Sequence, residues 1–316
     1  MITVKDEELH APGDHPNWQE SFYFNWSSDD GRSFGLTRIG LNHAAGTADA
    51  VMVMLHDGAA ELVYAAVGEP IPARVLETSL AEGLTIGRLT YTMLDPLGSW
   101  RIELAGRQHV ELTWTAFTPA VDFHESFPGD VEDLQAHFEQ SGHVAGSVVV
   151  GTHVADVKGL GQRDKSWGVR DWSGINGWEW IAGQFNENLS FNATLTDVNN
   201  VRSPAGFFFH DGTAHIVCGV RIEYTGGHCP ETVKIDITVD GDRTYVVTGK
   251  ARARVPLYKK GLFIEETQFG FECEIDGVRH EGVGVVEHAF HTGPAALVSR
   301  LPRLLKVVAQ ARKDSK

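Results

Sequence analysis

Cysteine is scarce in this sequence. Its three cysteines, Cys218, Cys229 and Cys273, form an odd set without CxxC spacing. Such a set argues against a disulfide scaffold and against a zinc ribbon, and it suits a protein of the reducing cytoplasm. We therefore expect a cytoplasmic protein whose stability comes from a packed core.

Long apolar runs are also missing. No stretch of eighteen apolar residues occurs, which excludes a membrane-spanning helix. The first residues, MITVKDEELHAPGDHP, are acidic and contain no apolar stretch of the kind that a signal peptide needs. At 316 residues, of which 42% are hydrophobic and 22% charged, the chain has room for a large core and has the composition of a globular protein.

The common nucleotide and hydrolase motifs are absent. The sequence has no GxSxG elbow, no P-loop and no GxGxxG after a strand. The fifteen histidines are scattered, and in the segment EHAFH a strand would point His288 and His291 to opposite faces. We therefore expect neither a metal site nor a redox cofactor.

Basic residues are few outside the C-terminal tail. The formal net charge is −15, and the tail from Thr292 carries six basic residues and one acidic residue, so the body is close to −20. A body of this charge repels phosphates, and no basic stripe with interleaved aromatics appears in it. We expect a small-molecule partner and no nucleic acid.

Asp-Gly pairs separate short β-rich segments. Four segments place Asp-Gly between two candidate strands: VMVMLHDGAAELVYAAV, FFFHDGTAHIVCGV, KIDITVDGDRTYVV and FECEIDGVRHEGVGVV. Asp-Gly supplies the positive φ angles of tight type I′ turns. In HVELTWTAF, Val110, Leu112, Trp114 and Ala116 recur with period 2. The sequence predicts an all-β protein built from antiparallel hairpins.

Helical patterns are confined to two segments. GDVEDLQAHFEQSG, with Asp130 as an N-cap and Gly142 as a stop, predicts a short linking helix near mid-chain. We therefore predict two antiparallel β-barrel or sandwich domains, over 1–128 and 129–291, and a basic amphipathic tail over 292–316. The tail predicts a terminal helix packed on the body or on another subunit, and weak contact with a membrane surface is the alternative. Homo-oligomerisation is left open.

The segment GLGQRDKSWGVRDW combines charged residues with tryptophan. Charged side chains are costly to bury unless they are paired, and tryptophan is costly to expose. The segment is therefore either a salt-bridged corner or the lining of a site. We predict an ordered loop or strand edge over 163–172, in which Arg163 or Arg170 pairs with Asp164 or Asp171.

A second group of chemically useful residues follows directly. Residues 167–180 hold four of the eight tryptophans, which fits an aromatic β core or the wall of a ligand pocket. In SFNATLTD, Asp197 shares a strand face with Phe191, Ala193 and Leu195. A carboxylic acid among apolar groups stays protonated and can serve as a general acid. The alternative is that Asp197 caps the turn at DVNN.

The central motif adds a family resemblance. GxGxRDKSWGxRDW resembles the GxGxRDHSWGxR motif of the AttH/carotenoid 1,2-hydratase (hydroxyneurosporene synthase-like) superfamily. HPNWQESFYFNW and HFEQSGHVAGSV are similar to uncharacterised bacterial members of that group. The resemblance covers about residues 15–290 and implies two tandem lipocalin-like β-barrels. It also implies hydration or cyclisation of terpenoids and related alkenes without redox cofactors.

The chain departs from the family's proposed catalytic set. That set combines the His and Trp of HSW with a Tyr and an Asp on a later strand. Trp167 matches the Trp, whereas Lys165 stands in the His position. Asp197 is the nearest later Asp on an apolar face, and Leu195 stands where the Tyr is expected. Carotenoid hydratase activity itself is therefore not carried over.

These observations predict a cofactor-independent lyase or isomerase, with hydratase- or cyclase-like acid–base chemistry. The substrate would be hydrophobic and terpenoid- or steroid-like, held in a barrel pocket. A non-catalytic carrier of such a molecule is the alternative. The candidate residues fall into two sets, the proton-transfer groups Asp197, Lys165 and Asp164, and the substrate-binding groups Trp167, Trp172, Trp178, Trp180 and Arg170.

Overall fold

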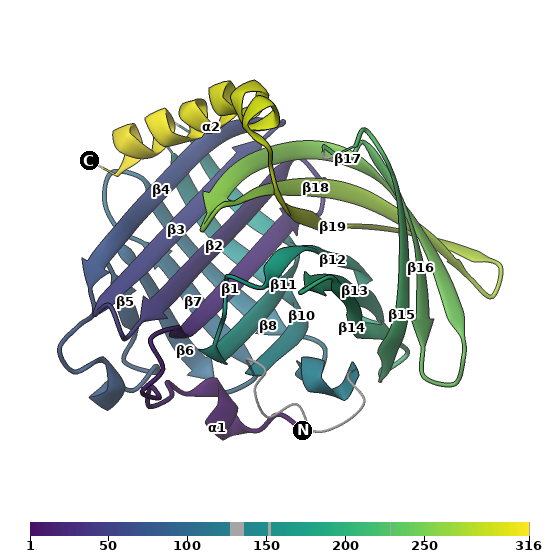
Figure 1. The fold of residues 1–316 in the computed structure, drawn as a ribbon, viewed down its shortest axis with the longest axis horizontal. Helices are drawn as coiled ribbons and strands as arrows, with labels where there is room; N and C mark the ends of the chain where they lie inside the picture. Colours follow the sequence, from purple (N-terminus) through teal and green to yellow (C-terminus); the bar gives the residue numbers. More distant parts are fainter. Residues whose placement is uncertain (127–135, 151–152, 228, 316) are drawn as a thin grey trace.

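A computed structural model describes residues 1–126, 136–150, 153–227 and 229–315. The described chain is predominantly β, as the sequence predicts, and forms two antiparallel sheets, each curved into a lipocalin-like barrel (Figure 1). None of its described helices is long and apolar enough to cross a membrane.

The first sheet has the strand order β4-β3-β2-β1-β11-β10-β8-β7-β6-β5, and β9 pairs with β10. Strands β4 and β5 form its two edges. Its strands are β1 (Trp18–Ser28), β2 (Ser33–Asn42), β3 (Thr47–His56), β4 (Ala59–Pro70), β5 (Leu84–Ile86), β6 (Leu89–Asp95), β7 (Ser99–Leu104), β8 (His109–Ala116), β9 (Val121–Asp122), β10 (Ala136–Val150) and β11 (His153–Val169).

The second sheet is a closed barrel in which each strand pairs with the next and β12 pairs with β19. Its strands are β12 (Ile175–Asn186), β13 (Leu189–Val198), β14 (Val201–His210), β15 (Thr213–Thr225), β16 (Thr232–Val239), β17 (Thr244–Lys259), β18 (Leu262–Ile275) and β19 (Val278–His291). The described helical segments are short except the last: α1 (Val4–Glu7), η1 (Val75–Glu77), η2 (Phe123–Ser126) and α2 (Pro294–Asp314).

The predicted Asp-Gly hairpins are present. Asp57, Asp211 and Asp276 each adopt positive φ before a glycine that also has positive φ, at the β3–β4, β14–β15 and β18–β19 turns. In the β16–β17 turn the positive angles fall one residue later, on Gly241 and Asp242. Local turn chemistry therefore sets these connections, because two successive positive φ angles match the twist of the strands.

The predicted mid-chain helix is wrong where the structure describes it. Residues 136–142 belong to strand β10, and residues 130–135 lie outside the described residues. Phe138 and Gln140 pair with Lys165 and Arg163 of β11, so the side chains follow period 2. Pairing with β8 and β11 on both sides decides the conformation here, since tertiary contacts override weak local helix propensity.

The same pairing places the boundary between the two sheets later in the chain than the sequence predicted. Strands β10 and β11 lie in the first sheet, and the second sheet begins at Ile175. By strand pairing, residues 136–169 therefore belong with the N-terminal barrel and not with the second barrel, where the sequence-based division at 128/129 places them. The RDKSWG motif is thus a strand of the first barrel.

Each barrel has its own packed interior, and a third cluster lies between them. The first interior includes Phe22, Phe24 and Trp26 of β1 with Trp100 and Trp114. Apolar side chains including Phe191, Phe208 and Phe271 fill the second. Tyr23, Trp180, Ala182 and Val285 pack together between the barrels. The interior aromatics of β1 alternate with residues that face the second barrel.

Helix α2 packs across β4 and β17, in agreement with the predicted docked tail (Figure 1). Arg303 pairs with the buried Glu265 at 2.8 Å. Near its end Asp314 accepts hydrogen bonds from the Val63 amide at 3.0 Å and from Gln108 at 2.7 Å. These contacts attach the C-terminus to both barrels.

Candidate active site

Strand β11 divides the RDKSWG motif between two faces of the first sheet. Arg163 and Lys165 point into the first barrel, where Arg163 lies over Trp114 and Lys165 over Phe22. Asp164 lies between them in sequence and therefore points the other way, toward the second barrel. Because side chains alternate along a strand, the predicted proton-transfer residues Lys165 and Asp164 lie on opposite faces of the first sheet.

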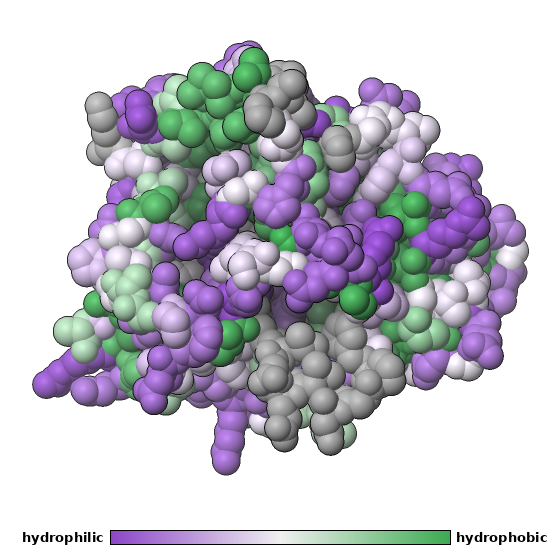
Figure 2. Space-filling model, viewed as in Figure 1, coloured by the Kyte–Doolittle hydropathy of each residue, from purple (hydrophilic) through white to green (hydrophobic). Residues whose placement is uncertain are grey.

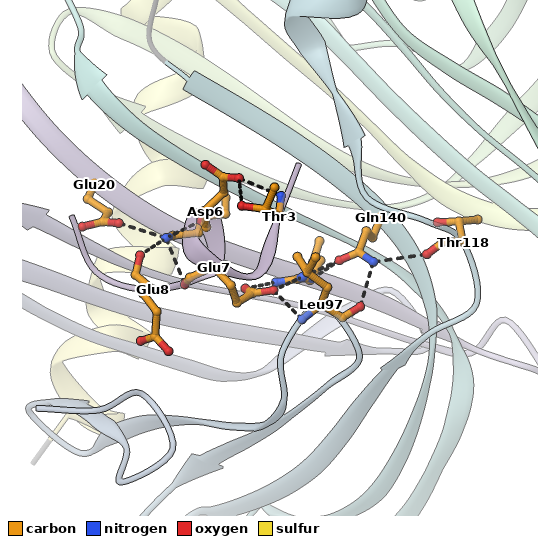
Figure 3. A network of polar contacts seen from close by, with 10 residues as sticks. Thr3, Asp6, Glu7, Glu8, Glu20, Leu97, Thr118 and Gln140 are labelled. Carbon is orange, nitrogen blue, oxygen red and sulfur yellow. Dashed lines mark hydrogen bonds and ion pairs between the residues drawn. The ribbon is translucent and has the colours of Figure 1, made fainter. Parts of the chain in front are cut away.

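The inward face binds the N-terminal segment. Both terminal guanidinium nitrogens of Arg163 donate to Glu7, each at 2.7 Å, and Glu7 is completely buried. Glu7 also accepts from the Leu97 amide, and Gln140, which accepts from Arg163, donates to the carbonyls of Leu97 and Thr118 (Figure 3). The network closes one end of the first barrel with residues from the start of the chain.

Lys165 belongs to the same closure. Its Nζ donates to the carbonyls of Asp6 at 2.9 Å, Glu7 at 3.0 Å and Glu8, and it lies 3.1 Å from the buried Glu20 carboxylate. All three ammonium protons therefore have acceptors, so Lys165 is a structural anchor in this conformation. Trp167 covers it, stacked on His10 with the ring centroids 4.2 Å apart.

The two glycines before the motif allow close strand packing. A Cβ on Gly159 would lie 2.0 Å from the Ser27 carbonyl oxygen, and one on Gly161 would lie 2.0 Å from that of Asn25. Any larger residue would push β11 away from β1. The GxG of the motif therefore lets Arg163 and Lys165 reach the barrel interior at the observed register.

A cluster of titratable groups lies on the outward face. Asp164 pairs in register with Glu139 of β10, and His137 lies two residues before Glu139. The His137 Nε2 atom lies 3.0 Å from Glu139 Oε1 and 3.9 Å from Asp164 Oδ1. Glu139 is completely buried, whereas the side chains of Asp164 and His137 are each 19% exposed. Asp164 is therefore the carboxyl group that a ligand can reach.

The second barrel supplies the opposite wall. Trp180 of β12 donates through Nε1 to Glu139 Oε1 at 2.7 Å, and its ring packs edge-on against Tyr23 at 5.6 Å. Gln162 donates to the other oxygen of Glu139, also at 2.7 Å. Trp178 donates to Glu287 of β19, which is paired in register with Glu266 of β18. Two carboxyl groups of the second barrel thus face two of the first.

Burial raises the pKa of several of these groups. It raises the pKa of Glu139 to about 8, although the hydrogen bonds from Gln162 and Trp180 act against it. It raises the pKa of Asp164 to about 7. Burial, and then the charge of Glu287, raise the pKa of Glu266 well above its usual range. At neutral pH the cluster therefore retains protons that exposed carboxyl groups would release.

His137 behaves in the opposite sense. Burial lowers its pKa to about 4, so the imidazole is neutral at pH 7. A neutral ring has one nitrogen that accepts a hydrogen bond. Nε2 forms no hydrogen bond within the described residues, although it lies 3.0 Å from Glu139 Oε1 and 3.9 Å from Asp164 Oδ1. The three residues thus place a neutral ring between a buried and a partly exposed carboxyl group.

The same three residues are the described group that could hold a metal ion, since their ligand atoms lie within 4.8 Å of one another. Both Glu139 oxygens already accept hydrogen bonds, from Trp180 and Gln162. Those donors favour a carboxyl group that exchanges protons, because a metal would compete with them for the same oxygens. Proton transfer is therefore the chemistry that this arrangement supports best.

The structure brings most of the predicted site residues together. Asp164, Trp178 and Trp180 line the interbarrel region. Trp172, in the connection between the barrels, lies 6.4 Å from the Trp178 ring, and Arg170 lies over Trp172 at 5.3 Å. Lys165 and Trp167 lie on the opposite face of the first sheet.

Asp197 lies at the end of β13, away from Asp164. Its carboxylate accepts a hydrogen bond from Asn176 at 2.8 Å, beside a turn in which Asn199 and Asn200 have positive φ. Asp197 therefore lies beside the DVNN turn, and its hydrogen-bond donor is a side chain of β12 and not the backbone of the turn. Asp197 and Lys165 do not face a common cavity, and neither contacts the interbarrel cluster.

The ion pairs predicted within residues 163–172 are wrong for Arg163 and Asp171. Arg163 pairs with Glu7, and Asp171 accepts from the amide and hydroxyl of Ser173 at 2.9 and 2.7 Å. Residues 163–167 are paired with β1 on one side and with β10 on the other, so they are central strand and not an edge. Because Arg163 points into the barrel interior, its partner is Glu7, which lies 156 positions away in the sequence.

Several residues of the cluster were missed in the sequence. His137 and Glu139 lie in the segment assigned to a helix, where their alternation with Phe138 and Gln140 was the available signal. Tyr23 alternates with the apolar Phe22 and Phe24, which already indicated that it faces the other side of the sheet. Glu287 stands directly before His288 in the sequence. Only the pairing of β19 with β12, which sets Glu287 opposite Trp180, shows that Glu287 belongs to the cluster.

A described groove lies elsewhere. It has a volume of about 490 Å³ and follows the outer face of β15–β18, where Lys234, Lys250 and Glu272 alternate with threonines. No cluster of buried acids lines it. The interbarrel cluster is therefore the candidate active site on chemical grounds.

A pH dependence of stability follows from the raised pKa values. Because the pKa of Glu139 is higher in the folded chain than its ordinary value near 4.5, its contribution to stability is present below that value. It is lost as the pH rises through about 8. Asp164 acts in the same direction up to about pH 7, whereas His137 costs stability as the pH falls from its ordinary pKa near 6.5 toward 4, which offsets only part of the change. We expect urea unfolding to show wild-type stability declining between pH 5 and 8.

The matched variant is Glu139→Gln, which keeps the shape and removes the titration. Its stability is expected to decline less over the same range, so that the difference between variant and wild type grows toward pH 8. Parallel pH profiles for the two proteins would contradict the burial of a protonated Glu139.

Comparison with known proteins supports the fold. The family described as "Domain of unknown function (DUF7064)" matches residues 3–292. Kievitone hydratase from Nectria haematococca has 13% identity and a TM-score of 0.63, with 92% of this chain and 93% of that chain covered. CghA with Sch210972 has 12% identity and a TM-score of 0.65, with coverages of 88% and 89%.

A putative AttH from Nitrosomonas europaea (NE1406) gives 14% identity and a TM-score of 0.59, with coverages of 88% and 94%. No curated protein sequence matches the chain significantly. At these identities the solved structures show a shared fold, which is the AttH-like fold that the motif resemblance implies.

Proposed function

We propose that this chain, which belongs to the DUF7064 family, is an enzyme that transfers protons to and from carbon at the cluster between its barrels. The reaction class is that of a lyase or isomerase, with hydratase- or cyclase-like acid–base chemistry and no cofactor. The observation that carries the proposal is Asp164, a partly exposed carboxyl group with a pKa raised to about 7, next to the His137–Glu139 pair. The shared fold with kievitone hydratase supports the reaction class.

Asp164 is proposed to act first as a general acid. Its proton forms the new C–H bond with the electron pair of a substrate double bond, which leaves a cation on the adjacent carbon. In a hydration, water adds to that carbon and returns a proton to the Asp164 carboxylate. In an isomerisation, the carboxylate removes a proton from a neighbouring carbon instead. A pKa near 7 suits both directions, because the group is present in both forms at neutral pH.

The surrounding residues are proposed to support the cation and the proton. The faces of Trp178 and Trp180 stabilise positive charge by up to ~2 kcal/mol or more when water is excluded. Glu139, held by Trp180 and Gln162, can return a proton to Asp164 through the neutral His137. Because the barrel interiors are packed with apolar side chains, the proposed site lies between the barrels and not within one.

The substrate is proposed to be a hydrophobic molecule of the terpenoid- or steroid-like class, bound against the tryptophans. Both proton-transfer candidates that lie outside the cluster, Lys165 and Asp197, are left out of this proposal. A non-catalytic carrier is the second candidate, since the tryptophan walls alone would hold such a ligand.

A deuterium experiment separates the two candidates. The protein is incubated in D₂O with a panel of terpenoid alkenes and enones, and products are followed by mass spectrometry. Catalysed addition of water, or catalysed incorporation of deuterium at carbon, is expected for the enzyme. Tight binding across the panel with neither reaction would support the carrier.

The exposed side of α2 bears on the choice of partner. Its apolar side chains gather at the top of the view in Figure 2 and follow one line along the helix, comprising Val298, Leu301, Leu305 and Val308. Exposed Lys306, Arg312 and Lys313 lie on the same helix. We keep weak contact with an anionic membrane surface as a proposal, which co-sedimentation with anionic vesicles tests. A cytoplasmic location and a homo-oligomer likewise remain proposals.

A further inference from the structure

Two cations near the cluster have no anionic partner among the described residues. Arg38 of β2 and Lys259 of β17 are both half-buried, and neither forms a hydrogen bond or an ion pair with the described part of the protein. Burial lowers the pKa of both groups, that of Lys259 well below its usual range. Partly desolvated cations without counter-ions are costly, so their presence calls for an explanation.

Strand register places Arg38 beside the proposed acid. Tyr23 of β1 pairs with Arg38 on one side and with Asp164 on the other, so all three side chains share the outward face. The guanidinium group lies along its own strand above Gly40, where an added Cβ would come within 2.4 Å of Nη1. Arg38 is therefore held over the sheet at the edge of the cluster.

Lys259 and Arg170 reach the same place from the second barrel and from the connection. Both lie over the Trp172 ring, each at 5.3 Å from its centroid. After burial, the charges of Arg38 and Arg170 are the next causes that lower the pKa of Lys259, which places the three cations within electrostatic reach of one another. The cations surround the tryptophan that continues the wall formed by Trp178.

The nearby carboxyl groups already have other partners. Asp49 accepts from the Gly68 amide at 2.9 Å, and Glu287 accepts from Trp178. Asp164 is protonated in part at neutral pH because its pKa is raised to about 7. None of these three carboxyl groups forms an ion pair with Arg38 or Lys259 within the described part of the chain.

We propose that Arg38, Lys259 and Arg170 bind the carboxylate of an otherwise apolar substrate and so orient its double bond over Asp164. This inference rests on the proposed function, and it specifies the substrate as a hydrophobic carboxylic acid. A guanidinium group presents paired donors that match a carboxylate, and the two cations on Trp172 leave an apolar surface directly beside the charge. The carboxylate supplies the counter-ion that Arg38 and Lys259 lack.

Retinoate and retinol form a matched pair of probes, since they share one terpenoid skeleton and differ in the charged end group. Binding is measured at pH 7 and low salt through quenching of tryptophan fluorescence. Retinoate is expected to bind at least about tenfold more tightly than retinol, the factor that one charged hydrogen bond supplies. Equal affinities, or no binding of retinoate, would overturn the inference.

Substitutions then test which cations bind the carboxylate of retinoate. Arg38→Met and Lys259→Met are each expected to reduce retinoate affinity about tenfold and to leave retinol affinity unchanged, whereas Lys250→Met in the outer groove changes neither. Gly40→Ala displaces Arg38 without removing charge and is expected to weaken retinoate binding alone. An equal loss for both probes would indicate a structural role and contradict the inference.

The same titration in Asp164→Asn separates this inference from the proposed function. Selectivity for retinoate is expected to persist in that variant, because the cations remain. If the wild type shows selectivity but no turnover of any acid, the carboxylate site stands and the proposed chemistry fails. If turnover occurs only with neutral substrates and retinoate has no advantage, the carboxylate site fails and the chemistry stands.

Discussion

Asp164→Asn is expected to lower turnover by about 10²–10⁴-fold, the usual contribution of a general acid or base. Asparagine keeps the shape of the side chain and cannot transfer the proton. Ligand affinity is expected to change little, because the tryptophan walls and the cations are untouched. The measurement is the rate of product formation, or of deuterium incorporation at carbon, on the best substrate of the panel.

The pH profile gives an independent check. With wild-type protein the rate is expected to change near pH 7, the pKa of Asp164, and not near 4, where an exposed aspartate titrates. Glu139→Gln is expected to shift that transition to lower pH, since the charge of Glu139 is among the causes that raise the pKa of Asp164.

Three further variants serve as controls. Asp171→Asn removes an exposed carboxylate seven residues away in the same segment and is expected to leave the rate unchanged. Asp197→Asn and Lys165→Met test the other two residues singled out in the sequence. A rate that survives Asp164→Asn and collapses in Asp197→Asn would place the chemistry at the end of the second barrel instead.

Arg163→Met is expected to destabilise the fold by about 3–5 kcal/mol, the cost of leaving a buried charge without its partner. Burial alone would raise the pKa of Glu7, but the charge and hydrogen bonds of Arg163 more than offset it, so the pKa lies below its usual range. Without Arg163 the Glu7 carboxylate must take up a proton or leave the barrel. Urea unfolding at pH 7 measures the loss.

The double variant Glu7→Gln, Arg163→Met tests the pairing. It is expected to recover part of the loss, since no charge is then left buried alone. Arg279→Met provides the matched control, because Arg279 pairs with Glu272 and Glu281 on the surface, where such pairs contribute about 0–1 kcal/mol. Equal losses in Arg163→Met and Arg279→Met would contradict the importance of the N-terminal closure.

Local patterns in the sequence were enough for the antiparallel hairpins and the C-terminal helix. Asp-Gly turns and alternation in segments such as HVELTWTAF predicted the antiparallel hairpins, because turn geometry and side-chain period are properties of neighbouring residues. The C-terminal helix was predicted from its apolar spacing for the same reason. The mid-chain helix failed because β10 is fixed by β8 and β11, whose contacts are remote in sequence.

The candidate site depended on contacts that no local pattern contains. The sequence by itself identified the unusual segment, its tryptophans and Asp164, since charged and aromatic residues in one stretch are conspicuous in composition. Only the tertiary structure decided that Arg163 and Lys165 serve the N-terminal segment while Asp164 meets Glu139 and Trp180. The physical reason is that adjacent residues of a strand face opposite environments. A pKa is then set by burial and by partners that arrive from other strands.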